Sequence, residues 1–217
     1  KPDYDFLQIG REYASRGFQN AGNQEASTTL RVQLALLEAR ALDAIGDSAA
    51  ALARVDAALA LDSRRRAVRH ERAVILFNLC RLDGARAAFE ALAAEDPNDG
   101  YVQYYLGLIR ERAGAIDEAE ARFLRAQKLD PAHFFVPYRV KRAVFEGLVA
   151  QVGNELEETS RAFLRSLRVE VQSLPADKDL FADDPPFAPT ILGLYRGTAL
   201  GEPSSPEEPR TIVLYQR

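Results

Sequence analysis

Apolar side chains recur at helical spacing over the first two-thirds of the chain, and this pattern itself repeats. When the chain is aligned on itself at an offset of 34 residues, three positions hold side chains of similar size in each repeat. Two hold small residues and one holds a mostly bulkier apolar residue: Ala39, Ala73 and Gly107; Ala51, Ala85 and Ala119; Val55, Phe89 and Phe123. Small residues let two helices pack closely, and the bulkier residue fills the space between units. The pattern therefore predicts three helical hairpins, at 32–65, 66–99 and 100–133.

The ends and turns of these units carry their own signals. Each unit closes on an aspartate, and the second and third aspartates are followed by Pro97 and Pro131. Because the residue before a proline disfavours the α region, the second helix of the unit should end there. Cys80 coincides with Gly46 and Gly114, at a position where this kind of repeat prefers glycine. We interpret Cys80 as a buried, unreactive thiol.

The pattern weakens on either side of the three units. Residues 1–31 predict one degenerate repeat helix, at 3–18, and then a loop, because residues 19–29 are polar and the offset to the next unit is 29 residues. A solenoid needs an end whose outer face is polar. The segment 134–152 is predicted to be the helix that caps this end.

The last third of the chain changes its period. Apolar residues at helical spacing predict helices around 145–156 and 163–167, whereas alternating or β-branched runs predict strands at 167–171, 191–195 and 211–215. Seven of the eleven prolines lie at or after Pro175, and they predict loops at 177–189 and 201–209. Residues 153–217 are therefore expected to form a small α+β domain, with the strand at 211–215 as an exposed edge.

Composition narrows the functional classes. The 217 residues carry a net charge of −4, with no basic excess in either part of the chain, which argues against nucleic-acid binding. No apolar run approaches the ~20 residues of a membrane-spanning helix. One cysteine and two histidines, His70 and His133, exclude a disulfide framework and predict neither a metal site nor catalytic residues within this chain. The chain starts at Lys1 and contains no methionine, so we expect a piece of a longer, cytoplasmic protein.

The 34-residue period, with small crossing residues and Asp-Pro closures, resembles the tetratricopeptide repeat. The resemblance implies a mainly α fold, namely an α-solenoid whose concave face is lined by the first helix of each unit and binds extended peptides of protein partners. The candidate groove residues in that register are Arg40, His70, Phe77, Asn78, Tyr101, Tyr104 and Arg112, with Phe135, Tyr138 and Arg142 from the cap. The alternative is that the aromatic residues among them pack against one another or against the next domain.

Short motifs in residues 144–217 carry a second resemblance. The strings Leu167–Val171, Ile191–Tyr195 and Pro209–Tyr215 look like those of the minimal zincin-like (matrixin-like) bacterial metallopeptidase domain. That family binds zinc through a helix bearing HExxH, in which two histidines hold the metal and the glutamate acts on the bound water. The nearest string in this chain begins at His70 and lacks the second histidine. The domain is therefore expected to be incomplete, and zinc is expected only if such a helix follows Arg217.

Three functions remain open at this point. The first is a zinc peptidase whose repeats recruit protein substrates and whose catalytic helix lies beyond Arg217. The second is a non-enzymatic scaffold that binds partner peptides in the groove of the repeats. The third is self-association through the strand edge at 211–215. The sequence does not name the partner or the oligomeric state.

Overall fold

The computed structural model describes residues 4–21, 25–138, 140–198 and 209–216. These residues form two compact units. The first contains residues 1–136 together with Phe181–Ala188, and we call it the repeat unit. The second contains Pro137–Leu180 and Pro189–Arg217, and we call it the sheet unit. Among the described residues, no helix combines the length and the apolar character that a bilayer crossing requires.

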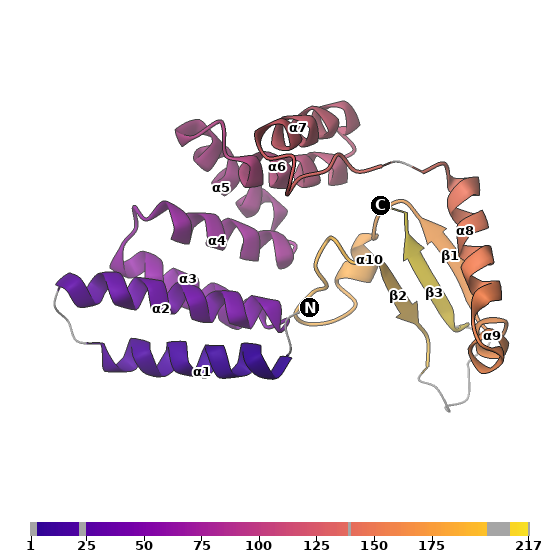
Figure 1. Cartoon of the computed structure of the whole chain (residues 1–217), viewed down its shortest axis with the longest axis horizontal. Coiled ribbons are helices and arrows are strands. Elements are labelled where there is room, and N and C mark those ends of the chain that lie inside the picture. The colour runs from indigo at the N-terminus through magenta and orange to yellow at the C-terminus, as the bar shows by residue number, and fades with distance from the viewer. Residues whose placement is uncertain (1–3, 22–24, 139, 199–208, 217) are drawn as a thin grey trace. The chain divides into compact units, whose positions relative to one another are not determined.

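The repeat unit is a stack of helices, each lying beside the next one along the chain (Figure 1). Its helices are α1 (Tyr4–Asn20), α2 (Glu25–Ala44), α3 (Ser48–Leu61), α4 (Arg66–Asn78), α5 (Leu82–Glu95), α6 (Gly100–Arg112) and α7 (Ile116–Leu129). The pairs α2–α3, α4–α5 and α6–α7 are the three predicted hairpins. The predicted α-solenoid is therefore confirmed.

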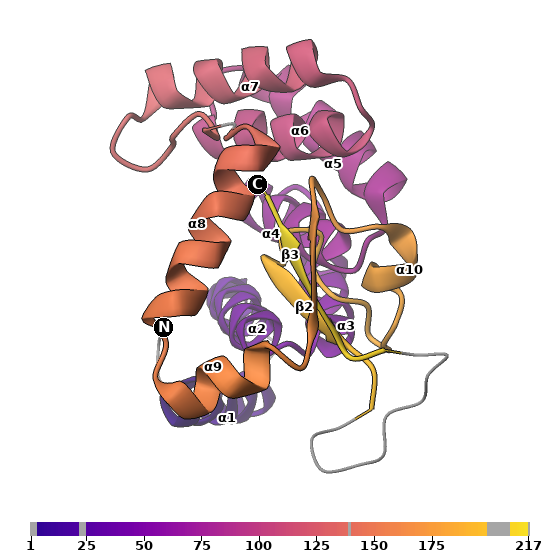
Figure 2. The ribbon, with the colours of Figure 1, turned by 90° about the vertical axis from the view of Figure 1, so that its right-hand side faces the viewer.

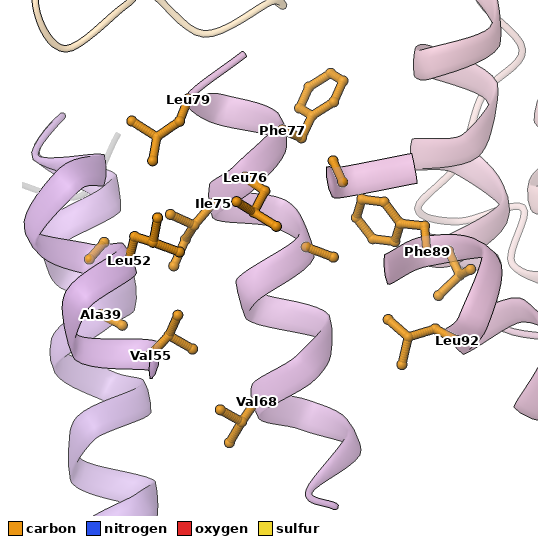
Figure 3. Packing of buried hydrophobic residues seen from close by; sticks show 14 of the residues in the cluster. Ala39, Leu52, Val55, Val68, Ile75, Leu76, Phe77, Leu79, Phe89 and Leu92 are labelled. Carbon is orange, nitrogen blue, oxygen red and sulfur yellow. The ribbon is translucent and has the colours of Figure 1, made fainter. Parts of the chain in front are cut away.

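The core of the repeat unit lies at the positions that the repeat marks. Ala51, Ala73 and Ala85 have no exposed surface, and neither do Val55 and Phe89. Figure 3 shows the side chains of α3 and α5 directed toward the central helix α4 from its two sides. The 34-residue period thus correctly predicts which face of each helix is buried against neighbouring helices.

Each hairpin turn passes through the left-handed region of backbone conformation. Gly46 has φ +95° and Gly114 has φ +77°, which glycine adopts without steric cost. At the equivalent turn Cys80 has φ +56°. A side chain in this region crowds the following carbonyl oxygen, so the cysteine strains a turn that glycine would leave relaxed.

Two predictions on the flanks of the repeats are wrong. The expected polar loop at 19–31 is largely helical, because α1 ends at Asn20 and α2 begins at Glu25; packing between α1 and α2 overrides the weak polar signal. The expected capping helix over 134–152 does not begin at 134. Residues 134–138 are not helical, consistent with Pro137, which disfavours a helix in the residue before it. The helix α8 (Arg142–Glu155) starts later and belongs to the sheet unit.

The sheet unit contains a three-stranded mixed sheet with a helix on either side. Its remaining elements are α9 (Glu158–Leu164), β1 (Arg168–Gln172), α10 (Asp177–Leu180), β2 (Gly193–Arg196) and β3 (Thr211–Tyr215). The strand order is β1-β3-β2, with β1 parallel and β2 antiparallel to β3. The helices α8 and α10 lie on opposite sides of this sheet, as both views show (Figures 1 and 2).

The expected strands and loops of this unit are largely confirmed, with one important exception. All three strands form within one or two residues of the predicted ranges, and the first predicted loop contains the short helix α10. The second predicted loop, at 201–209, lies almost wholly outside the described residues. The expectation of an exposed edge at 211–215 is wrong, because β3 is the central strand and pairs on both sides.

A buried ionic cluster fastens α10 to the sheet. The Asp179 side chain is 2% exposed. Its Oδ1 accepts a hydrogen bond from Arg196 Nε at 2.8 Å, and its Oδ2 accepts one from the Tyr215 hydroxyl at 3.0 Å. Arg196 also lies 3.6 Å from a carboxylate oxygen of Glu170. Because the charge of Asp179 is paired and hydrogen-bonded on both oxygens, its burial is tolerated.

Candidate peptide-binding site

Aromatic side chains from two successive repeats gather on one face of the repeat unit. The ring of His70, on α4, lies edge-on to Tyr101, on α6, with 6.1 Å between ring centroids. Tyr101 in turn meets Phe134 edge-on at 4.8 Å, and Tyr104 lies 5.4 Å from the same phenylalanine. Tyr101 remains 51% exposed. We call His70, Tyr101, Tyr104 and Phe134 the aromatic face; it is an apolar surface that solvent can still reach.

Burial sets the charge state of the histidine on this face. The pKa of His70 is lowered from its ordinary value mainly because burial disfavours the charged imidazolium. The nearby Asp99 opposes this shift, while Arg66 and Arg40 reinforce it. His70 is therefore neutral at pH 7, with one ring nitrogen able to donate and the other able to accept a hydrogen bond.

A polar network links the first helices of repeats one and two. Arg40 Nε on α2 lies 2.6 Å from Glu71 Oε2 on α4. Asn78 donates a hydrogen bond to Asp43 Oδ2 at 2.8 Å, and Ser48 donates one to the other oxygen of Asp43 at 2.6 Å. Burial raises the pKa of Glu71, and the hydrogen bond from Arg40 opposes that shift. The predicted groove residues Arg40 and Asn78 therefore already hold neighbouring helices together.

Phe77 lies deeper in the repeat unit than a groove residue would, and Tyr105 packs beside it. Phe77, a candidate groove residue, is 1% exposed and belongs to the core. Tyr105, which the sequence analysis did not select, lies edge-on to Phe77 at 5.3 Å and stacks on Phe89 at 4.9 Å. Burial, with the nearby charges of Asp43 and Glu71, raises the pKa of Tyr105 to about 12. Helical register alone could not show that Phe77 is buried, because its surroundings include side chains of another helix, such as Tyr105 on α6.

The remaining candidates fall into two groups. Arg112 is half-buried at the end of α6. Tyr138 and Arg142 belong to the sheet unit, where Tyr138 is 85% exposed and Arg142 pairs with Glu146 at 2.8 Å. From the expected cap, Phe135 is exposed, whereas its neighbour Phe134 is buried against α6. The glycine at position 100 is the signal that could have identified Phe134. A Cβ atom at Gly100 would lie 2.8 Å from the ring of Phe134, so glycine leaves room for that ring.

The sheet unit offers a cleft but no set of zinc ligands. The cleft has a volume of about 800 Å³ and lies among α8, α9 and β1. Half of its polar lining residues are arginines, namely Arg142, Arg161, Arg165 and Arg168. Zinc in proteins is held by histidine, cysteine and carboxylate groups. Residues 137–217 contain no histidine or cysteine, and the described residues contain no group of three potential ligands, so the residues present do not fit a zinc centre.

A solenoid of 34-residue hairpins defines a helical repeat protein. Comparison with protein families identifies the repeats: residues 36–100 and 70–133 match the tetratricopeptide repeat family. Residues 164–217 match the family described as zincin-like metallopeptidase. Residues 36–133 are therefore tetratricopeptide repeats, which form a protein-interaction module, and residues 164–217 are a zincin-like segment.

Solved structures of other repeat proteins resemble the chain. One is YrrB, described as a tetratricopeptide-repeat protein with an unusual peptide-binding site; it is 16% identical, with a TM-score of 0.49, over 70% of this chain and 68% of that one. Another is a MamA fragment from Desulfovibrio magneticus RS-1, which is 20% identical, with a TM-score of 0.43, over 58% of this chain and 76% of that one. No curated protein matches the chain.

Proposed function

We propose that the repeat unit binds an extended peptide segment of a protein partner across its aromatic face. The observation that supports this proposal most directly is the exposure of Tyr101 beside His70 and Tyr104, because aromatic rings held by neighbouring rings form rigid anchors with little entropy left to lose. The polar links of Arg40 and Asn78 keep α2 and α4 in place beside this face. We propose that this binding takes place in the cytoplasm.

The proposal is tested by selecting peptides that bind the purified chain from a displayed random library. The affinities of the selected peptides are then measured for the wild type, for Tyr101→Ala and for Tyr104→Ala. Removing an aromatic anchor from an interface should weaken binding about tenfold or more. The matched control is Tyr13→Ala, since Tyr13 is also an exposed tyrosine (71%) but lies on α1.

Circular dichroism must show that each variant keeps its helical content. Selected peptides that bind both aromatic-face variants as tightly as the wild type would place the binding surface elsewhere. The proposal is also contradicted if the library yields no peptide whose binding is weakened by Tyr101→Ala.

A second candidate function is zinc-dependent peptide hydrolysis, which the zincin-like match of residues 164–217 favours. The described residues hold no ligand set, so this activity would require a HExxH helix outside residues 1–217. Native mass spectrometry of the protein from the complete reading frame tests this possibility. One retained zinc ion, lost when a downstream HExxH histidine is changed, would support a peptidase; a reading frame without that motif would leave the scaffold function.

A further inference from the structure

One edge of the sheet in the sheet unit lies along the arginine-rich cleft. In the strand order β1-β3-β2, β1 pairs only with β3 among the described residues, so its other side carries no strand. All five residues of β1, 168–172, line the cleft together with residues of α8 and α9, and Figure 1 shows α8 beside β1. Because successive residues of a strand point to opposite faces of the sheet, a cleft that touches all five runs along the edge of the strand. We call the side of β1 that faces away from β3 the open edge.

Two residues of β1 present their backbone polar groups at the open edge. The N–H of Arg168 donates to a carbonyl oxygen just before β3, with 3.0 Å between nitrogen and oxygen, and the carbonyl of Gln172 accepts from an N–H just after β3 at 2.8 Å. In a parallel ladder every second residue turns its backbone groups toward the same neighbour, so residues 168, 170 and 172 bond to β3. The N–H and C=O groups of Val169 and Val171 therefore point away from β3. Such an edge is a template for a further strand.

The charged residues around the cleft favour a negatively charged ligand. The cleft is lined by four arginines and two glutamates, namely Arg142, Arg161, Arg165, Arg168, Glu146 and Glu170. Positive charge is thus in local excess, although the whole chain has a net charge of −4. A ligand that carries carboxylates complements this excess.

Arg165 is the arginine of the cleft whose charge no described residue pairs. Arg142 and Arg168 pair with the two glutamates, at 2.8 Å and 3.1 Å, and Arg161 donates to a backbone carbonyl oxygen at 2.7 Å. Arg165 is exposed, and within the described part of the chain its guanidinium group forms no hydrogen bond or ion pair. A carboxylate that enters the cleft can therefore pair with Arg165 without breaking an existing contact.

Apolar side chains complete the lining and define the rest of the ligand. Val149, Leu164, Val169 and Val171 line the cleft, and Val169 is 38% exposed. An extended segment in which β-branched and acidic residues alternate matches this lining, because its two rows of side chains can meet apolar groups and arginines separately. The open edge of a second copy fits less well, since it would bring the same positive excess against itself.

We propose that the open edge of β1 binds an extended segment of another protein in which β-branched and acidic residues alternate. The segment joins the sheet as a fourth strand, through backbone hydrogen bonds with Val169 and Val171. Its carboxylates pair with the arginines of the cleft, first of all with Arg165. This site lies in the sheet unit, and the proposal does not depend on peptide binding at the aromatic face.

The test measures binding of a fluorescein-labelled peptide, Thr-Glu-Val-Glu-Val-Glu-Thr, to the purified chain by fluorescence anisotropy. This acidic peptide should bind, and a peptide with lysine in place of each glutamate should not. Arg165→Glu should weaken binding of the acidic peptide about tenfold or more, because repulsion replaces attraction. The matched control is Arg64→Glu, since Arg64 is also exposed, with a guanidinium group that no described residue pairs, but lies in the repeat unit.

Strand addition is tested separately from charge by changing the backbone at the open edge. Val169→Pro removes an outward N–H, and proline is tolerated in an edge strand at such a position. This variant should lose binding of the acidic peptide, whereas Val169→Thr, which keeps the N–H, should bind within about twofold of the wild type. In the wild type the acidic peptide should also slow amide hydrogen exchange at Val169 and Val171.

Circular dichroism must show that each variant keeps the helical content of the wild type. If Val169→Pro loses its fold, the comparison with Arg165→Glu and the hydrogen exchange of the wild type decide the outcome. Equal binding by the wild type and Arg165→Glu, or no binding at peptide concentrations up to about 1 mM, would overturn the proposal. A dimer in light scattering that Val169→Pro dissociates would also overturn it, because a second copy would then occupy the open edge.

Discussion

Replacing Gly107 by alanine perturbs the closest approach of two helices in the repeat unit. Gly107 lies on α6, facing α7, at the small-residue position of the third repeat. A Cβ atom added there would lie 2.6 Å and 2.7 Å from two ring carbons of Phe123. Phe123 is 1% exposed, so the ring has no free space into which to move. The helices must therefore separate or the ring must leave its preferred rotamer.

Two opposing effects set the size of the change. Overpacking of a core costs about 1–3 kcal/mol. Replacing glycine by alanine inside a helix returns about 1 kcal/mol. Repeat two already holds Ala73 in register with Phe89, both fully buried, so a slightly wider helix spacing is attainable and the cost need not exceed this range. Gly10→Ala is the control, because it gains helix propensity without a new contact. A Cβ atom at Gly10 on α1 meets no atom within 4 Å.

Both variants gain the same helix propensity, so the difference between them isolates the contact with Phe123. Chemical denaturation followed by far-UV circular dichroism should give Gly10→Ala a stability about 1–3 kcal/mol above that of Gly107→Ala. Adding Phe123→Leu to Gly107→Ala should recover part of the loss, which a double-mutant cycle measures. Equal stabilities for the two single alanine variants would refute the close approach of α6 and α7.

Two further predictions concern buried charges and hydroxyl groups. Asp179→Asn should destabilise the sheet unit by about 2–3 kcal/mol in thermal unfolding, because Arg196 loses its buried carboxylate partner; an unchanged transition would contradict the role of the ionic cluster. Tyr105 and Tyr215 should ionise later than ordinary tyrosines in an ultraviolet titration, because burial raises the pKa of each to about 12. Since the folded pKa lies above the unfolded value, the associated stability is present below pH ~10 and is lost as the pH rises toward 12. Tyr105→Phe should remove one of the tyrosines that ionise late. If every tyrosine of the wild type ionised near its ordinary pKa of about 10, the reasoning would be wrong.

The sequence by itself was sufficient for features that repeat or alternate. The small residues at Ala39, Ala73 and Gly107 recur because the helices of each repeat pack in the same way, so one period encodes the packing within the three repeats. The strands at 167–171 and 211–215 were predicted from alternating or β-branched residues, which is a local property as well, and the structure has them at 168–172 and 211–215. Register also selected His70, Tyr101 and Tyr104, which the structure brings together around Phe134.

The candidate site was only partly predictable, because register gives the side of a helix and not the depth of a side chain. Phe77 and Tyr104 share the first-helix surface in the repeat pattern, yet Phe77 is buried and Tyr104 is half-exposed. Phe134 covers α6 although it follows the last repeat, where no period remains to place it. Such depth depends on side chains from other helices and can be decided only when those helices are assembled.

Tertiary structure alone decided the features that join distant parts of the chain. The strand at 211–215 pairs with neighbours on both sides, because strand order depends on partners far away in sequence. Asp179 is a charged residue in a predicted loop, but Arg196 and Tyr215 make its burial possible. The contact of Cys80 with Phe187 spans 107 positions, and no local pattern announces it. Periodicity records what each residue does beside its neighbours, whereas these contacts exist only because the folded chain brings separate segments together.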